Sequence, residues 1–190
     1  MPTDDLFTAE QFAACRHELP DGGRWTELHA GRPVLLSPPT VEHGNAVLNL
    51  GKALAEFSQH GPGGYACFEL GFTIARNPDT VLLPPACFFM TGAMFAESDK
   101  ILTEARPTLV VEVASSNDRR RGMNDRIGGW LNWGVSLAWL LDPHAKKVHV
   151  FEKGRDGQPL GEHEMLTGRS VLPGFQTSVG NLFNEPGWYK

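Results

Sequence analysis

The sequence predicts a single α/β domain in which a mixed β-sheet is flanked by helices. Residues Thr108–Val113 (TLVVEV) form a nearly continuous β-branched run, which is typical of a central strand buried on both faces. An amphipathic helical pattern follows this run, and Val135–Leu141 then resumes an extended pattern. This order favours a parallel βαβ unit, with Val110–Val113 and Leu137–Leu141 side by side at the centre of the sheet.

Length and composition agree with one globular domain over residues 1–190. A chain of 190 residues leaves little room for a second domain. Hydrophobic residues make up 41% and charged residues 21%, far from the composition of disordered chains. We therefore expect one hydrophobic core.

The N-terminal part of the chain predicts a short helix and a hairpin. Residues 8–17 begin with Thr8, and Gln11 stands three positions later, which is the spacing of a capping box. Trp25–Leu28 and Pro33–Leu36 are short extended runs around a turn, and we expect them to pair as a β-hairpin.

A long helix and a second antiparallel pair are expected next. The helix should begin at Val41 and end near Gly61, because apolar residues recur there at intervals of three and four. Tyr65–Ala75 and Val81–Phe89 flank the turn-forming residues 77–79 and are expected to pair.

The helix after the central strand has signals at both ends. N-cap chemistry is supplied by Ser115, Ser116, Asn117 and Asp118. Gly134 is placed as the C-terminal stop. The buried face is expected to carry Met123, Ile127, Trp130 and Leu131.

The C-terminal part predicts further extended structure. Lys147–Glu152 reads as a strand, and a weaker strand is expected near His163–Leu166. Residues 172–175 (LPGF) are expected to form a turn.

Charge and targeting signals limit the classes of function. The net charge of -5 and the pI near 5.8 do not favour tight generic binding to nucleic acid, so any DNA binding is expected to be weak. The chain contains no apolar run long enough to span a bilayer, and its N-terminal residues are polar. We expect a cytoplasmic protein that is neither secreted nor embedded in a membrane.

The cysteines and the common catalytic motifs give little direct guidance. Cys15, Cys67 and Cys87 are widely spaced and form no CxxC pair, so neither a zinc site nor a redox motif is expected from spacing, and a reducing compartment is the simplest setting. The histidines lack HxH or HExxH spacing. GxSxG, P-loop and GxGxxG motifs are absent as well, so no small-molecule cofactor is expected.

Six sequence segments occur in an order that points to one family. The segments are Arg24–Leu28 with Gly31, Ser37–Pro39 followed by His43, Val110–Val113 with Ser115 and Ser116, Ile127–Gly134, Trp139–Pro143, and Val171–Gly174. Together they resemble the Uma-type restriction endonuclease family, bacterial proteins of the PD-(D/E)XK superfamily, over nearly the whole chain. The resemblance implies a restriction-endonuclease-like fold and, weakly, a homodimer.

The resemblance also implies a Mg²⁺ site made by two acidic residues from adjacent strands and a lysine from the following helix. Hard oxygen ligands hold Mg²⁺, which polarises the phosphodiester and lowers the pKa of bound water. Glu112 occupies the family's acidic position on the central strand. Pro85 stands where the family has the aspartate of its "PD" pair, and Arg126 stands where it has the lysine. Proline offers no side-chain ligand, and arginine cannot lose its proton near neutral pH.

Several residues remain as candidates with alternative roles. Asp79 would replace the missing ligand only if the chain folded back, and otherwise it favours its turn. Glu27 is a candidate for the same site, and its alternative is an exposed strand glutamate. His43 is a further candidate, and its alternative is a helix cap or a packing residue. Glu112 is either a metal ligand or a buried carboxylate paired with an arginine. The basic run 119–121 is expected to be a solvated face.

The sequence therefore predicts a nuclease-fold protein that is inactive or weak in phosphodiester cleavage. Two alternatives stay open. One is an active Mg²⁺-dependent DNA endonuclease that uses Glu112 with Asp79 or Glu27. The other is a non-enzymatic module that binds a protein partner.

Overall fold

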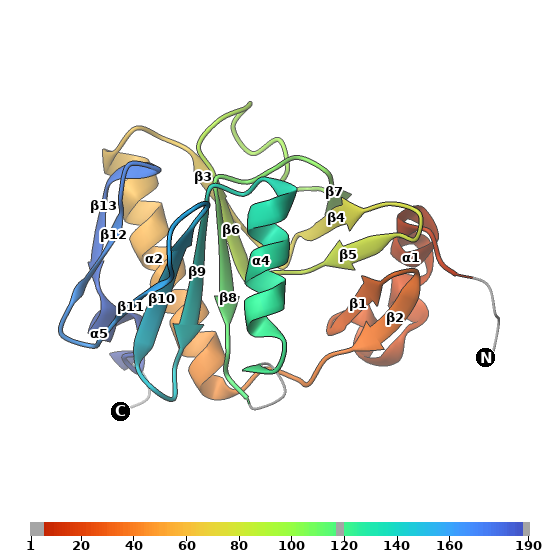
Figure 1. The fold of residues 1–190 in the computed structure, drawn as a ribbon, viewed down its shortest axis with the longest axis horizontal. Helices are drawn as coiled ribbons and strands as arrows, with labels where there is room; N and C mark the ends of the chain where they lie inside the picture. The colour runs from red at the N-terminus through yellow and green to blue at the C-terminus, as the bar shows by residue number, and fades with distance from the viewer. Residues whose placement is uncertain (1–5, 117–119, 188–190) are drawn as a thin grey trace.

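The computed structural model describes residues 6–116 and 120–187, and Figure 1 shows its fold. A six-stranded sheet has the order β11-β10-β9-β8-β6-β3. Its strands are β3 (Tyr65–Phe68), β6 (Ala86–Phe89), β8 (Leu109–Val113), β9 (Leu137–Asp142), β10 (Lys147–Glu152) and β11 (Gln158–Leu160). The predicted central strand is confirmed, because β8 lies inside this sheet and all five of its residues are buried.

The predicted βαβ unit is also confirmed. Strands β8 and β9 are parallel, with Leu109 opposite Leu137 and Val113 opposite Leu141. Helix α4 (Met123–Trp133) connects them and packs on one face of the sheet. The opposite face is covered by α2 (Val41–His60), whose Leu50, Leu54 and Phe57 join the largest cluster of buried residues.

A second sheet stands beside α4 in Figure 1 and has the order β2-β1-β5-β4-β7. Its strands are β1 (Thr26–His29), β2 (Arg32–Leu35), β4 (Gly71–Ala75), β5 (Thr80–Leu82) and β7 (Leu102–Thr103). The predicted hairpin is confirmed as β1 and β2, with Thr26 opposite Leu35. Helix α1 (Ala9–Cys15) packs against this sheet through Phe12, and Thr8 and Gln11 form the predicted capping box. Two 3-10 turns, Arg16–Glu18 and Pro20–Gly23, follow α1.

The second antiparallel pair is divided between the two sheets. Its inner halves, β4 and β5, pair in the second sheet, whereas its outer halves, β3 and β6, pair in the six-stranded sheet. The chain leaves one sheet and enters the other at residues 69–70 and again at residues 83–85. At the second crossing, Pro84 and Pro85 have no backbone N–H to donate to a neighbouring strand. Thus the expected two long strands are four short ones.

Three further details differ from the predictions. Helix α4 begins after Gly122, which has a positive φ and no side-chain cap, so the assignment of Ser115 and Ser116 as its N-cap is wrong; Asn117 and Asp118 lie outside the described residues. The residues predicted as a turn, 172–175, instead lie within β13 (Leu172–Ser178), which pairs with β12 (Met165–Gly168). The predicted C-terminal stop at Gly134 is confirmed, since this residue has φ 116° and its N–H bonds back to Trp130 and Leu131.

The remaining described helix is α5 (Val179–Leu182), a single turn whose Val179 and Leu182 are buried in the same core as α2. Among the described residues, no helix is both long and apolar enough to cross a bilayer.

Candidate functional site

The ends of β6 and β8 define the centre of the candidate site. These strands are antiparallel, with Ala86 opposite Val111. Pro85 directly precedes β6, just beyond the last paired residues, and it lines a small pocket with Glu27 and His43. Val110, two positions before Glu112 on β8, has its side chain in the core under α4, as does Cys87 on β6. The family resemblance predicts the second carboxylate at position 85, directly before β6.

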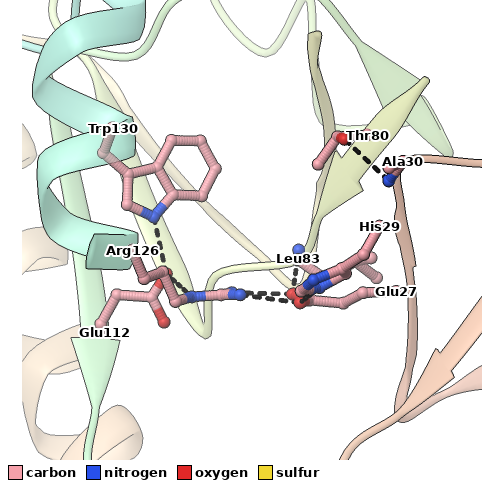
Figure 2. A network of polar contacts seen from close by, with 8 residues as sticks. All are labelled: Glu27, His29, Ala30, Thr80, Leu83, Glu112, Arg126 and Trp130. Carbon is pink, nitrogen blue, oxygen red and sulfur yellow. Dashed lines mark hydrogen bonds and ion pairs between the residues drawn. The ribbon is translucent and has the colours of Figure 1, made fainter. Parts of the chain in front are cut away.

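Glu112 is a buried carboxylate at the end of the central strand. Its side chain is only 3% exposed, and its Oε1 atom accepts two hydrogen bonds from α4 at 2.7 Å each, one from Arg126 Nε and one from Trp130 Nε1 (Figure 2). Complete burial raises the pKa of Glu112 even though the Arg126 charge opposes this shift. Trp130 is itself fully buried, so it fixes Glu112 from within the core.

Glu27 reaches the same arginine from the other sheet. Arg126 uses both terminal nitrogens, Nη1 and Nη2, to donate to the two oxygens of Glu27 at 2.7 Å each. The Leu83 backbone N–H adds a 2.7 Å bond to Glu27 Oε1, and His29 Nε2 lies 2.9 Å from Oε2. Burial alone would raise the pKa of Glu27, but the Arg126 charge and these hydrogen bonds lower it to about 2.

Arg126 therefore lies between two carboxylates that come from different sheets. Figure 2 shows its guanidinium between Glu112 on β8 and Glu27 on β1. Burial opposes its charge, yet the two carboxylates raise its pKa well above the ordinary value, so it remains charged. A planar guanidinium suits this position because its Nε and terminal nitrogens can donate hydrogen bonds to two carboxylates at once. The network links α4, β8 and β1.

A cavity of about 400 Å³ opens next to this network, between α4 and the second sheet. Glu112 and Arg126 are among its lining residues, together with Arg121 and Asp125 near the start of α4. Both signs of charge are present. The cavity is thus not a purely basic groove of the kind that holds a phosphate backbone.

The other predicted site residues lie around the network rather than within it. His43 is in the first turn of α2, where its Nδ1 lies 3.2 Å from Ser115 Oγ, and it lines a small pocket shared with Glu27 and Pro85. Arg121 lines the larger cavity, and Arg120 pairs with Asp142 at 2.7 Å. Arg119 lies outside the described residues.

Asp79 has structural partners. Its Oδ2 accepts from the Ala9 backbone at 2.7 Å and from Arg76 at 2.9 Å, and its Oδ1 accepts from the Asn77 backbone. Because Ala9 is the first residue of α1, these bonds fasten that helix to the turn before β5. They account for its burial without a metal.

The donor set around Glu112 does not fit a Mg²⁺ site. The two nearby carboxylates already accept three hydrogen bonds from Arg126, and the side chain of Pro85 offers no oxygen. Within residues 6–116 and 120–187, no three His, Cys, Asp or Glu side chains are grouped so that they could share a cation. Mg²⁺ needs well-placed oxygen ligands and keeps its water otherwise.

Sequence reasoning did not find the roles of Trp130, His29 and the Leu83 backbone. Trp130 was expected only as an apolar residue on the helix face, and helical spacing does signal its position one turn after Arg126. The Leu83 contact has no such signal, because it depends on how two separate sheets meet.

The match to a family model decides the family of the chain. The Uma2 model, described as "Putative restriction endonuclease", matches residues 10–180. The chain belongs to the Uma2 family. The predicted resemblance is thereby confirmed.

Uma2 membership agrees with the structural comparison. The fold is similar to a crystal structure described as "a putative nuclease belonging to DUF820 from Anabaena variabilis ATCC 29413", with a TM-score of 0.73. The two chains are 17% identical, and the match covers 87% of this chain and 93% of the other. A search among curated proteins gave no match. The expected nuclease-like α/β fold is confirmed.

Proposed function

We propose that this Uma2 protein keeps the nuclease fold but has lost metal-dependent phosphodiester cleavage, or retains it only weakly. The observation that supports this is the position of Arg126, whose guanidinium bonds to both Glu27 and Glu112 at 2.7 Å. In this arrangement a fixed positive charge neutralises the carboxylates that would otherwise hold a divalent cation.

Pro85 supports the same proposal independently. It stands where the family resemblance puts the second carboxylate, directly before β6, the strand that pairs with β8. The chain thus lacks one ligand and fills the space beside the other with a guanidinium. Each change alone weakens a Mg²⁺ site, because that ion is usually held by one or two carboxylates and gives up water reluctantly.

One observation favours the active-endonuclease alternative. Glu27 and Glu112 come from different sheets, yet they converge on the same guanidinium. If Arg126 moved away, two buried carboxylates would face the same space. That alternative requires a metal to compete with a bidentate ion pair, so we rank it second.

The experiment compares cleavage of duplex DNA by the natural protein and by rebuilt variants in Mg²⁺ or Mn²⁺. The natural protein is expected to show no cleavage above background. Pro85→Asp combined with Arg126→Lys is expected to restore some cleavage. The double substitution supplies the missing carboxylate and replaces the planar guanidinium by a compact ammonium group. Pro84→Asp with Arg126→Lys is the matched control, since it adds the same carboxylate one residue away from the family's position.

Partial recovery is the realistic outcome, because a site misplaced by about 1 Å can lose on the order of a hundredfold in rate. Clear cleavage by the natural protein, abolished by EDTA and by Glu112→Ala, would contradict the proposal and support the active alternative.

A further inference from the structure

Two cysteines that are 20 positions apart in the sequence are direct neighbours in the six-stranded sheet. Strands β3 and β6 are antiparallel, and their register sets Cys67 opposite Cys87. Directly opposite residues have Cα atoms about 4.5 to 5.5 Å apart, which lies within the range of about 4.4 to 6.8 Å that disulfides span. A Cα separation of this size is compatible with a disulfide between the two residues.

Because the two residues are directly opposite each other, their side chains point to the same face of the sheet. Both side chains belong to the core beneath α4, with Cys67 6% and Cys87 1% exposed. Both are free thiols. An isolated buried cysteine is usually an inert apolar residue, but here each thiol has another as its neighbour.

The surroundings distinguish the two thiols chemically. The neighbouring Cys87 thiol, helped by Ser98 Oγ at 3.8 Å, lowers the pKa of Cys67 to about 7, although burial opposes this. Burial and the neighbouring Cys67 raise the pKa of Cys87 well above its usual value. Because the thiolate is the reactive form, we expect Cys67 to act as the nucleophile and Cys87 as the resolving thiol. Cys67 also lies on β3, the edge strand of the sheet.

We propose that Cys67 and Cys87 form a reversible dithiol–disulfide site that hydroperoxides oxidise. The Cys67 thiolate attacks one oxygen of the peroxide, the O–O bond breaks, and a Cys67 sulfenic acid and a hydroxide are formed. The Cys87 sulfur then attacks the Cys67 sulfur and forms the S–S bond, while its proton leaves with the sulfenic hydroxyl as water. In sum, two thiols are oxidised and one hydrogen peroxide is reduced to two waters.

This site is separate from the Arg126 network, and its test does not depend on cleavage of DNA. Its consequence is structural, because the disulfide would tie the edge strand β3 to β6, which enters the sheet directly after Pro85.

The experiment treats the folded full-length protein with hydrogen peroxide and maps its thiols by mass spectrometry without reduction. We expect loss of two of the three thiols, a peptide pair joined through Cys67 and Cys87, and full reversal by dithiothreitol. Cys15→Ser is the matched control and should oxidise in the same way, since Cys15 lies on α1, away from the sheet. Cys87→Ser should stop at a sulfenic acid on Cys67 that dimedone traps, and Cys67→Ser should form no disulfide.

Circular dichroism will show whether the serine variants fold, and the map of the unmodified protein decides the question without them. The proposal is overturned if the folded protein retains both thiols at peroxide concentrations that oxidise the same chain in urea. A disulfide that includes Cys15, or one between two copies of the chain, would overturn it as well.

Discussion

Arg126 and Glu27 form a bidentate ion pair across 99 positions of sequence, with two N–H···O contacts of 2.7 Å. The pair joins α4, which packs on the six-stranded sheet, to β1 of the second sheet. The side chains are 16% and 1% exposed, so the interaction is shielded from water. Glu112 completes the network from β8.

Arg126→Met should destabilise the protein strongly. It keeps an apolar stem of similar length but leaves two carboxylates buried without their cation, and breaking a buried pair in this way costs about 3 to 5 kcal/mol of unfolding free energy. Urea denaturation at neutral pH measures the change. Lys146→Met is the control, because Lys146 and Glu162 form an exposed pair whose loss should cost less than about 1 kcal/mol. Equal costs for the two variants would contradict a central role for Arg126.

The indole N–H of Trp130 should contribute measurably to the position of Glu112. Trp130→Phe removes a donor to a buried carboxylate, whereas Trp139→Phe removes an N–H that has no hydrogen-bond partner among the described residues. Both tryptophans are fully buried, so the loss of apolar area is matched. The first substitution should cost about 1.5 to 3 kcal/mol more than the second. Chemical denaturation of both variants checks this, and a smaller cost for Trp130→Phe would show that the bond is unimportant.

Acid should lower the free energy of unfolding, because it protonates Glu27. The pKa of this group is lowered from 4.5 to about 2 in the folded protein, since Arg126 and its hydrogen bonds outweigh burial. Its contribution is fully present above pH 4.5 and is lost as the pH falls toward 2, with a total on the order of 3 kcal/mol. Glu112 acts in the opposite direction, because its pKa is raised.

Glu27→Gln removes the ionisable group and isolates its share. Unfolding free energies measured between pH 5 and about 2.5 should fall less steeply for this variant than for the natural protein. If the two curves have the same slope, Glu27 does not carry the acid sensitivity.

Pro85→Asp alone should not create a nuclease. The new carboxylate would lie directly before β6, the strand that pairs with β8, and Arg126 would remain charged and bonded to Glu112. We therefore expect no metal-dependent cleavage from this single variant in a plasmid nicking assay. Activity without the Arg126→Lys change would mean that Arg126 does not block the site.

The central part of the fold follows from local sequence patterns. The β-branched run of β8, the helical spacing of α4 and Gly134 all act within a few residues, so the βαβ unit can be recognised from them. The division of the chain between two sheets could not be predicted, because Pro84 and Pro85 show where strands end but not which sheet each piece joins.

The candidate site was predictable only in part. Family motifs point to Glu112, Pro85 and Arg126, and the predicted first hairpin carries Glu27 as a further candidate. The convergence of Glu27 and Glu112 on Arg126 depends on how the two sheets meet, which is a long-range property. For the same reason, the spacing of Cys67 and Cys87 gave no sign of their pairing across β3 and β6.

Titration of the natural protein with Mn²⁺ by calorimetry tests the central claim most directly. If Arg126 fills the place of a cation between Glu27 and Glu112, binding should be absent or have a dissociation constant in the millimolar range or weaker, by an order-of-magnitude argument from the number of available carboxylates. Micromolar affinity that is abolished by Glu112→Gln would show that a complete metal site exists and would contradict the account.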